Sequence, residues 1–193
     1  MDSKITFPIT DKIFIEILIP GNETELYRYD EVTIKLKLID KEITIYADDF
    51  VIEALRSLDG ILEKVIKGKL VLHPSISEIG YRYNEALNDS PNLVYENFEG
   101  RKWWVGENYL LWSTNSKYSK TTWMYNKNGD VYLEITPNYK WIFDEPNGDE
   151  KFIEYEEFMK KYKADFVFKL NNDLLVQWKK RCEKLLKIID KNG

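Results

Sequence analysis

The segment from Thr121 to Thr136, TTWMYNKNGDVYLEIT, constrains the fold of this chain more than any other stretch. Two runs with apolar residues at every second position flank the pair Asn128-Gly129. Asn-Gly suits a two-residue type I′ turn, in which both central residues have positive φ. The segment therefore predicts a β-hairpin whose register is fixed by the turn. Its expected cross-strand pairs are Lys127 with Asp130, Tyr125 with Tyr132, and Trp123 with Glu134.

This hairpin should have an aliphatic face and an aromatic face, because successive side chains of a strand point to opposite sides. If Pro137-Asn138 makes a second tight turn, a third strand adds Trp141 and Phe143 to the aromatic side. The predicted aromatic face then comprises Trp123, Tyr125, Tyr132, Glu134, Trp141 and Phe143.

Other segments supply further strands and helices without the alternation of βαβ units. Period-two alternation of apolar residues predicts strands over residues 12–19, 32–40 and 42–47. An apolar stripe at three- and four-residue steps predicts a helix over residues 48–68. Residues 152–162 should form a short helix, residues 164–170 a last strand or an extended lead-in, and Asn172 should cap a final helix. Residues 69–92 are less regular, although residues 69–74 could form a short strand that ends at Pro74.

Antiparallel strands combined with a few helices define the α+β class. We therefore expect a twisted, meander-rich antiparallel β-sheet with one central and two C-terminal helices packed on one face. A length of 193 residues fits one domain. The chain is predicted to be a single α+β domain over residues 1–193, with a sub-boundary near 88–92 as the alternative.

Composition narrows the classes of function. The net charge is −5, from 33 acidic and 28 basic residues, and this disfavours nucleic acid as the main partner because phosphate binding needs a basic face. No stretch approaches the roughly 18 apolar residues of a membrane span, and the N-terminal segment lacks the unbroken apolar run of a signal peptide. Cys182 is the single cysteine, so a cytoplasmic location is expected. Abundant Lys, Asn and Ile with scarce Arg suggest a bacterial source.

Signatures of catalysis and of cofactor binding are missing from the sequence. His73 is the only histidine, and its position before Pro74 at a predicted strand end favours a surface role. Cys182 lies on the apolar stripe of the last helix, where a thiol is usually a small buried hydrophobe. One His and one Cys do not suffice for tetrahedral zinc, and no glycine-rich phosphate loop occurs. We therefore expect no cofactor and no metal.

Charged and aromatic residues are distributed unevenly, and this is the main clue to function. Residues 144–157 hold seven acidic residues and one basic residue, whereas residues 101–128 hold five basic residues and one acidic residue. The stretch 100–115 also carries Trp103, Trp104 and Trp112. Because these aromatic residues change parity along the stretch, a central core strand with a bulge at Gly106 is the simplest interpretation.

The favoured hypothesis is a non-catalytic cytosolic protein-binding domain. Six Trp and 13 Tyr are more aromatic surface than one helix-covered sheet face hides, so we expect part of the aromatic face to be open. A small immunity- or inhibitor-type protein that neutralises a basic bacterial toxin fits the size, acidity and aromatic content. The predicted binding residues are Trp123, Tyr125, Tyr132, Glu134 and Trp141 on the aromatic face, and Asp149, Glu150, Glu154, Glu156 and Glu157 as acids that steer a basic partner.

Three alternatives stay open. A carbohydrate- or nucleic-acid-binding module would use the basic aromatic segment 101–125. Its contact residues would be Trp103, Trp104, Lys117 and Lys120. A weaker alternative is a hydrolase that pairs Glu134 with Glu107 or Asp144, since glycosidases use two carboxylates across a sugar cleft. The aromatic face could equally mediate self-association.

Overall fold

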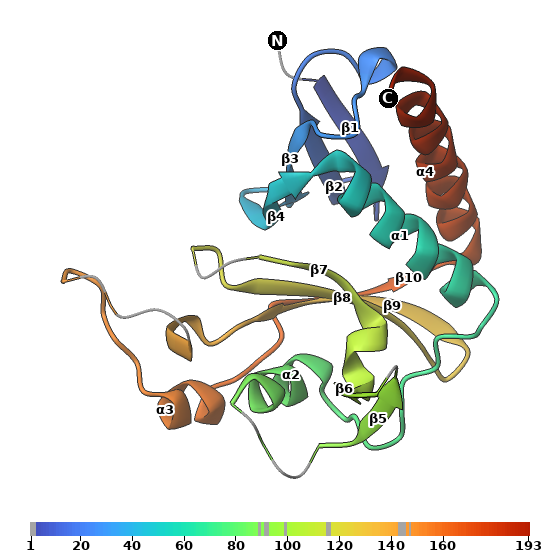
Figure 1. Cartoon of the computed structure of the whole chain (residues 1–193). Coiled ribbons are helices and arrows are strands. Elements are labelled where there is room, and N and C mark those ends of the chain that lie inside the picture. Colours follow the sequence, from blue (N-terminus) through green and yellow to red (C-terminus); the bar gives the residue numbers. More distant parts are fainter. Residues whose placement is uncertain are drawn as a thin grey trace.

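The computed structural model describes residues 3–88, 90, 93–98, 100–114, 117–142, 146 and 148–193, with the side chain of Phe98 excepted. Within this part of the chain, antiparallel sheets of four, four and two strands combine with α-helices (Figure 1), so the predicted α+β class is confirmed. The strands fall into three sheets, and helices lie on both sides of one of them.

The N-terminal sheet is an antiparallel meander with the strand order β1-β2-β3-β4. Its strands are β1 (Ser3–Pro8), β2 (Phe14–Ile19), β3 (Glu31–Lys37) and β4 (Glu42–Phe50). A short 3-10 turn, η1 (Glu23–Glu25), lies in the connection between β2 and β3. Register places Ile5 opposite Ile17 and Ile17 opposite Ile34, and all three are fully buried. The alternation of apolar residues in β2 and β3 is what the sequence pattern predicted, because one face of the sheet packs on the core. Strand β1 was not predicted.

The central sheet has the order β10-β9-β8-β7. Its strands are β7 (Leu110–Ser113), β8 (Lys120–Lys127), β9 (Asp130–Pro137) and β10 (Phe166–Leu170). The hairpin of β8 and β9 has the predicted register, including Tyr125 opposite Tyr132 and Trp123 opposite Glu134. Its turn residues Asn128 and Gly129 have φ of 54° and 84°, as a type I′ turn requires.

The third strand of this meander is β10 and not the segment that carries Trp141. Trp141 lies in η3 (Lys140–Ile142), a short 3-10 turn, so the prediction that it extends the hairpin is wrong. A Pro-Asn turn matches the twist of a hairpin poorly. Instead, Asn138 donates its backbone N–H to Ser119 and the chain leaves the sheet. Phe143 lies outside the described residues.

Two long helices, α1 (Val51–Ile66) and α4 (Asn172–Asn192), pack against each other on one side of the central sheet (Figure 1). Helix α1 contacts strands of both four-stranded sheets. The predicted apolar stripe of α4, which includes Trp178 and Cys182, is buried. One hydrophobic core cluster therefore contains residues from both sheets and both helices.

A second layer covers the opposite side of the central sheet (Figure 1). It contains α2 (Ile79–Leu87), α3 (Tyr155–Lys160), the hairpin of β5 (Tyr95–Phe98) and β6 (Arg101–Trp104), and the 3-10 turn η2 (Val105–Tyr109). Both faces of β8 are buried, since the six consecutive residues from Thr121 to Asn126 are all buried, and each face is therefore covered by another layer. In the part of the chain that the structure describes, none of the helices is both long enough and apolar enough to cross a membrane.

Candidate binding surface

The aromatic face of the central sheet is covered at Trp123, Tyr125 and Glu134, so these three residues do not form the open surface that was expected. Trp123 has no exposed surface. The ring of Tyr83 from α2 packs edge-on against it with 5.0 Å between centroids, and Trp104 from β6 packs edge-on at 6.3 Å. Trp123 also donates its indole N–H to the Thr136 hydroxyl at 2.9 Å. In this conformation Trp123 is a core residue and offers no surface to a partner.

Tyr125 and Glu134 lie beneath the same cover. Only 4% of Tyr125 and 7% of Glu134 is exposed. Burial raises the pKa of the Glu134 carboxyl, and a hydrogen bond from Tyr125 partly opposes that rise. Burial likewise raises the pKa of Glu107, and Asp144 lies outside the described residues. A hydrolytic carboxylate has to reach both substrate and water, and Glu134 has almost no exposed surface from which to do so.

The other two described aromatic residues of the predicted face, Tyr132 and Trp141, are half-buried and lie in different places. Tyr132 stacks on Tyr125 with 5.8 Å between ring centroids. Trp141 packs between Tyr139 at 5.8 Å and Phe152 at 5.4 Å, at the base of the loop that leads to α3. Among the predicted aromatic residues that the structure describes, Trp141 is therefore the one that approaches the acidic segment.

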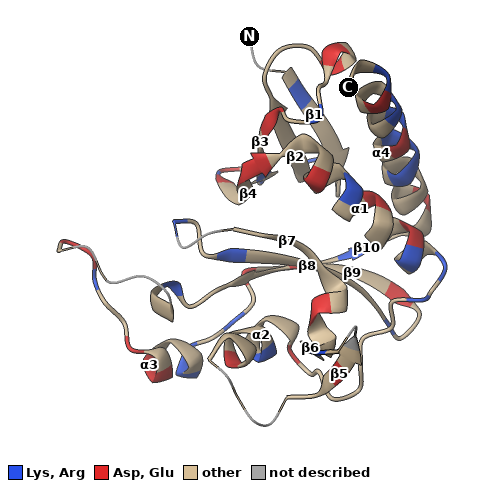
Figure 2. Cartoon of the chain, in the orientation of Figure 1, with Lys and Arg blue, Asp and Glu red and all other residues tan. Residues whose placement is uncertain are grey.

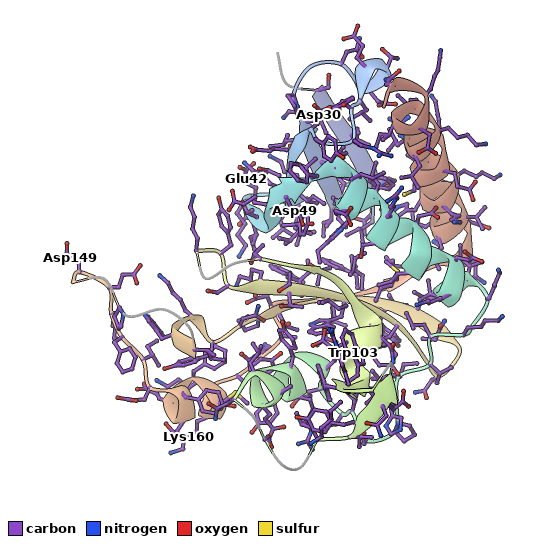
Figure 3. The ribbon with its side chains drawn as sticks, in the orientation of Figure 1. Asp30, Glu42, Asp49, Trp103, Asp149 and Lys160 are labelled. Atoms are coloured by element: carbon purple, nitrogen blue, oxygen red, sulfur yellow. The ribbon has the colours of Figure 1, made fainter. Side chains whose placement is uncertain are left out.

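All five predicted acidic residues are exposed. The loop before α3 extends away from the body of the molecule and carries Asp149 at its outer end (Figure 3). Glu150 pairs with Lys140 at 2.5 Å and Glu157 with Lys161 at 2.6 Å. Asp149, Glu154 and Glu156 make no ion pair with another described residue, so their charges are available to a ligand.

Three of these acids line a groove between α2 and α3, which we call the α2–α3 groove. Its volume is about 650 Å³, which lies in the usual range of ligand pockets. The lining residues are Tyr81, Glu85, Glu154, Tyr155, Glu156, Glu157, Met159 and Lys160. Two tyrosines, a methionine and four glutamates thus surround one concave surface.

Packing behind the groove holds its aromatic walls. Tyr155 packs edge-on against Tyr139 at 5.3 Å, and its hydroxyl donates to the backbone carbonyl of Asn84 at 3.2 Å. Tyr81 packs edge-on against Tyr162 at 5.6 Å. The side chain of Asn84 is fully buried and accepts the backbone N–H of Tyr139 at 2.6 Å. The two tyrosine rings that line the groove are therefore held in position before any ligand arrives.

The electrostatic environment of the groove is negative. The pKa of Tyr155 rises to about 12, first because of burial and then because of Glu85, Tyr81 and Glu156. The pKa of Tyr139 also rises, through burial and through Glu154 and Glu156. Both phenols resist becoming anions, first because burial disfavours the charged form and second because negative charge is close by. The same field favours a cation in the groove.

Basic residues collect at the opposite end of the molecule, along the outer face of α4 (Figure 2). Their spacing places them on one stripe of that helix. They are Lys180, Lys184, Lys187 and Lys191, all exposed and without an ion pair to another described residue. The molecule therefore has a basic helix and a distant acidic loop.

The basic aromatic segment 101–125 does not form one surface. Trp103 on β6 is 45% exposed, whereas Trp104 is buried against Trp123. Lys120 is the first residue of β8 and pairs with Asp165 at 2.7 Å, and Lys117 is three residues before it in the chain. The start of β8, next to its connection with β7, lies at the end of the central sheet that is far from β6 (Figure 1). The residues chosen for the carbohydrate- or nucleic-acid-binding alternative are thus separated by the fold.

Sequence reasoning missed several residues of these surfaces. Tyr81 and Glu85 line the groove from a helix that was not predicted, although their four-residue spacing would have placed them on one helical face. A separate exposed cluster at the edge of the N-terminal sheet consists of Tyr27, Tyr29 and Phe50, whose rings contact one another edge-on. Phe50 is 21 residues after Tyr29 in the chain, and the pairing of β4 with β3, which places Phe50 opposite Glu31, brings it close to the two tyrosines. No local pattern therefore indicated this cluster.

Among the residues that the structure describes, no group of three or more His, Cys, Asp or Glu side chains is placed so that it could hold a metal ion. His73 accepts or donates a hydrogen bond with the Ser75 hydroxyl at 2.7 Å. Comparison of the chain with protein-family models, with curated proteins and with solved structures found no match.

Proposed function

We propose that this protein is a non-catalytic binding domain that recognises a basic protein partner through α3 and the loop before it. The observation that carries the proposal is a set of exposed carboxylates that make no ion pair with another described residue, together with the half-buried rings of Trp141 and Tyr155 in the same region. These carboxylates are Asp149, Glu154 and Glu156.

These two features have different roles in association. Clustered charges of one sign accelerate the encounter with a partner of opposite charge. Aromatic side chains at the centre of an interface supply most of the affinity, because they bury a large area at low entropic cost. Trp141 and Tyr155 belong to one packed series of rings that also includes Tyr139 and Phe152, so both would meet a partner in fixed positions.

In its specific form, the proposal is that the partner is a basic bacterial toxin and that the chain is a cytoplasmic immunity- or inhibitor-type protein. Its support is the net charge of −5 and the excess of acidic over basic residues in α3 and the loop before it (Figure 2). Binding alone would neutralise a toxin if the acidic surface covered the toxin's basic active face.

The test is affinity capture from a lysate of the source cells with three baits. The first is the wild-type chain, and the second is the triple variant Asp149→Asn, Glu154→Gln, Glu156→Gln. The third is a matched control that neutralises three exposed acids elsewhere. The control substitutions are Glu25→Gln, Glu31→Gln and Asp190→Asn.

We expect one basic protein to be retained in stoichiometric amount by the wild type and by the control, and to be lost at high salt and with the triple variant. Equal capture by all three baits would place the interface elsewhere, and capture of nothing would contradict the proposal. Co-expression of the captured protein with the chain then tests neutralisation, since the wild type should restore host growth and the triple variant should not.

A further inference from the structure

We propose that the α2–α3 groove is a specificity pocket for one arginine side chain of the basic partner. This inference rests on the proposed function and deepens it, because it names the group that the partner inserts. It also assigns a role to Tyr81 and Glu85, which the sequence did not single out.

The walls of the groove suit a flat cation. Tyr81 and Tyr155 present aromatic rings, and a cation near the face of an aromatic ring is attracted by the ring's quadrupole. Met159 adds a polarizable apolar surface for the methylene stem of the side chain. Since Tyr162 and Tyr139 support the two rings from behind, little ordering remains to be done on binding.

The carboxylates supply acceptors that the chain itself does not use. Glu85 is already paired with Arg82 at 2.6 Å, and Glu157 with Lys161 at 2.6 Å. Glu154 and Glu156 line the same groove without an ion pair to another described residue. An incoming cation therefore finds two unpaired carboxylates next to aromatic walls, and no existing ion pair has to break.

Arginine fits this combination better than lysine. The guanidinium group is planar, stacks on aromatic rings and donates two parallel hydrogen bonds to a carboxylate. It is also less strongly hydrated than an ammonium group, so it loses less on entering a partly apolar groove. At the groove wall, Glu85 already accepts one guanidinium hydrogen bond, from Nη1 of Arg82 at 2.6 Å.

Lys160 is the one basic residue among those that line the groove. It is exposed on α3 and makes no ion pair with another described residue (Figure 3). Its ammonium group opposes a second cation nearby, so its removal should strengthen binding. A purely structural role for the groove predicts no such gain.

The experiment is an NMR titration of the isotope-labelled full chain with N-acetyl-arginine amide, with N-acetyl-lysine amide and with N-acetyl-citrulline amide. Citrulline has nearly the shape of arginine but no charge. We expect saturable shifts at α3 and α2 residues with the arginine probe, weaker ones with lysine and none with citrulline. Saturation should require more probe as salt increases.

Variants of the groove residues test whether the arginine probe binds at the α2–α3 groove. Glu154→Gln with Glu156→Gln should weaken binding of the arginine probe about tenfold or more, whereas Lys160→Ala should strengthen it. Glu25→Gln with Glu31→Gln is the matched control and should change nothing. Equal shifts with arginine and citrulline, or arginine shifts confined to other surfaces, would overturn the inference.

These outcomes are distinct from failure of the proposed function. If a basic protein is captured and its affinity is insensitive to Glu154→Gln and Glu156→Gln but lost with Asp149→Asn, the pocket inference fails and the proposed function stands. If the arginine probe binds the groove and no basic protein is captured, the proposed function fails and the groove is a binding site for free guanidinium compounds.

Discussion

The hydroxyl of Tyr125 on β8 donates a 2.5 Å hydrogen bond to Oε2 of Glu134 on β9. The two residues are diagonal neighbours, because Tyr125 lies opposite Tyr132 and Glu134 lies opposite Trp123. Both are buried under the second layer of the fold. A carboxyl in such a place is costly to ionise, and a single donor offsets only part of that cost.

Substitution Glu134→Gln should therefore increase stability at higher pH. The folded pKa of Glu134 is raised by burial, so the stability linked to its proton is fully present below the ordinary pKa of about 4.3. It is lost as pH rises through the folded pKa. Urea unfolding measures the free energy of unfolding of both proteins at pH 4 and pH 8. The stability of the variant relative to the wild type should be higher at pH 8 than at pH 4. Glu156→Gln, at an exposed glutamate, is the control. If the difference in free energy of unfolding between Glu134→Gln and the wild type is the same at both pH values, the prediction is contradicted.

Glu42 should have the opposite dependence on pH. Hydrogen bonds from Lys35 and Lys37 lower its pKa to about 2, so its contribution is present above the ordinary pKa and is lost as pH falls toward 2. In Glu42→Gln, the free energy of unfolding should therefore decrease less than in the wild type as pH falls from about 5 to about 2. Glu25→Gln, at an exposed glutamate without an ion pair to another described residue, should leave that side unchanged.

Asn84→Ala should destabilise the fold by about 2–4 kcal/mol. The buried amide accepts the N–H of Tyr139 at 2.6 Å and donates to the carbonyls of Gly80 at 2.8 Å and Pro137 at 3.1 Å. Its loss leaves buried polar groups without partners. Chemical denaturation measures the change, and a loss well under 1 kcal/mol would mean that water replaces the amide.

Two glycine-to-alanine changes should act in opposite directions. A Cβ at Gly80 would lie 2.1 Å from the Tyr162 hydroxyl oxygen and 2.5 Å from Thr136 Cβ, so Gly80→Ala should cost about 1–3 kcal/mol. Gly60 lies inside α1 with nothing within 4 Å of an added Cβ, and Gly60→Ala should stabilise by about 0.5–1 kcal/mol. Thermal unfolding of both variants tests the pair, and shifts of the same sign would contradict the packing around Gly80.

Cys182 should be unreactive in the folded protein. Burial raises the pKa of its thiol to about 12, and none of its surface is exposed. A thiol reagent such as Ellman's reagent should therefore modify it only after unfolding. Stoichiometric modification in native buffer within seconds would show that α4 opens readily.

Local sequence determined the elements whose signal lies within a few residues. The register of β8 and β9 follows from Asn128-Gly129, since the turn needs two residues with positive φ. Helix α1 and the buried stripe of α4 follow from their apolar spacing. Even so, the predicted start of α4 is wrong by one residue. The residue that caps the helix is Asn171 and not Asn172, since the Asn171 side chain accepts the backbone N–H of Leu174.

Tertiary structure alone decided which faces are covered and which are free. The sequence indicated an aromatic face on β8 and β9, but the cover comes from Tyr83 and Trp104, which are distant along the chain. Helix α2 was missed because its side chains are fixed by long-range bonds, such as those of Asn84. The acids of α3 were predicted from composition, whereas their groove exists only where α2 packs beside them. Periodicity reports which side of an element is apolar, and only long-range packing determines what lies against it.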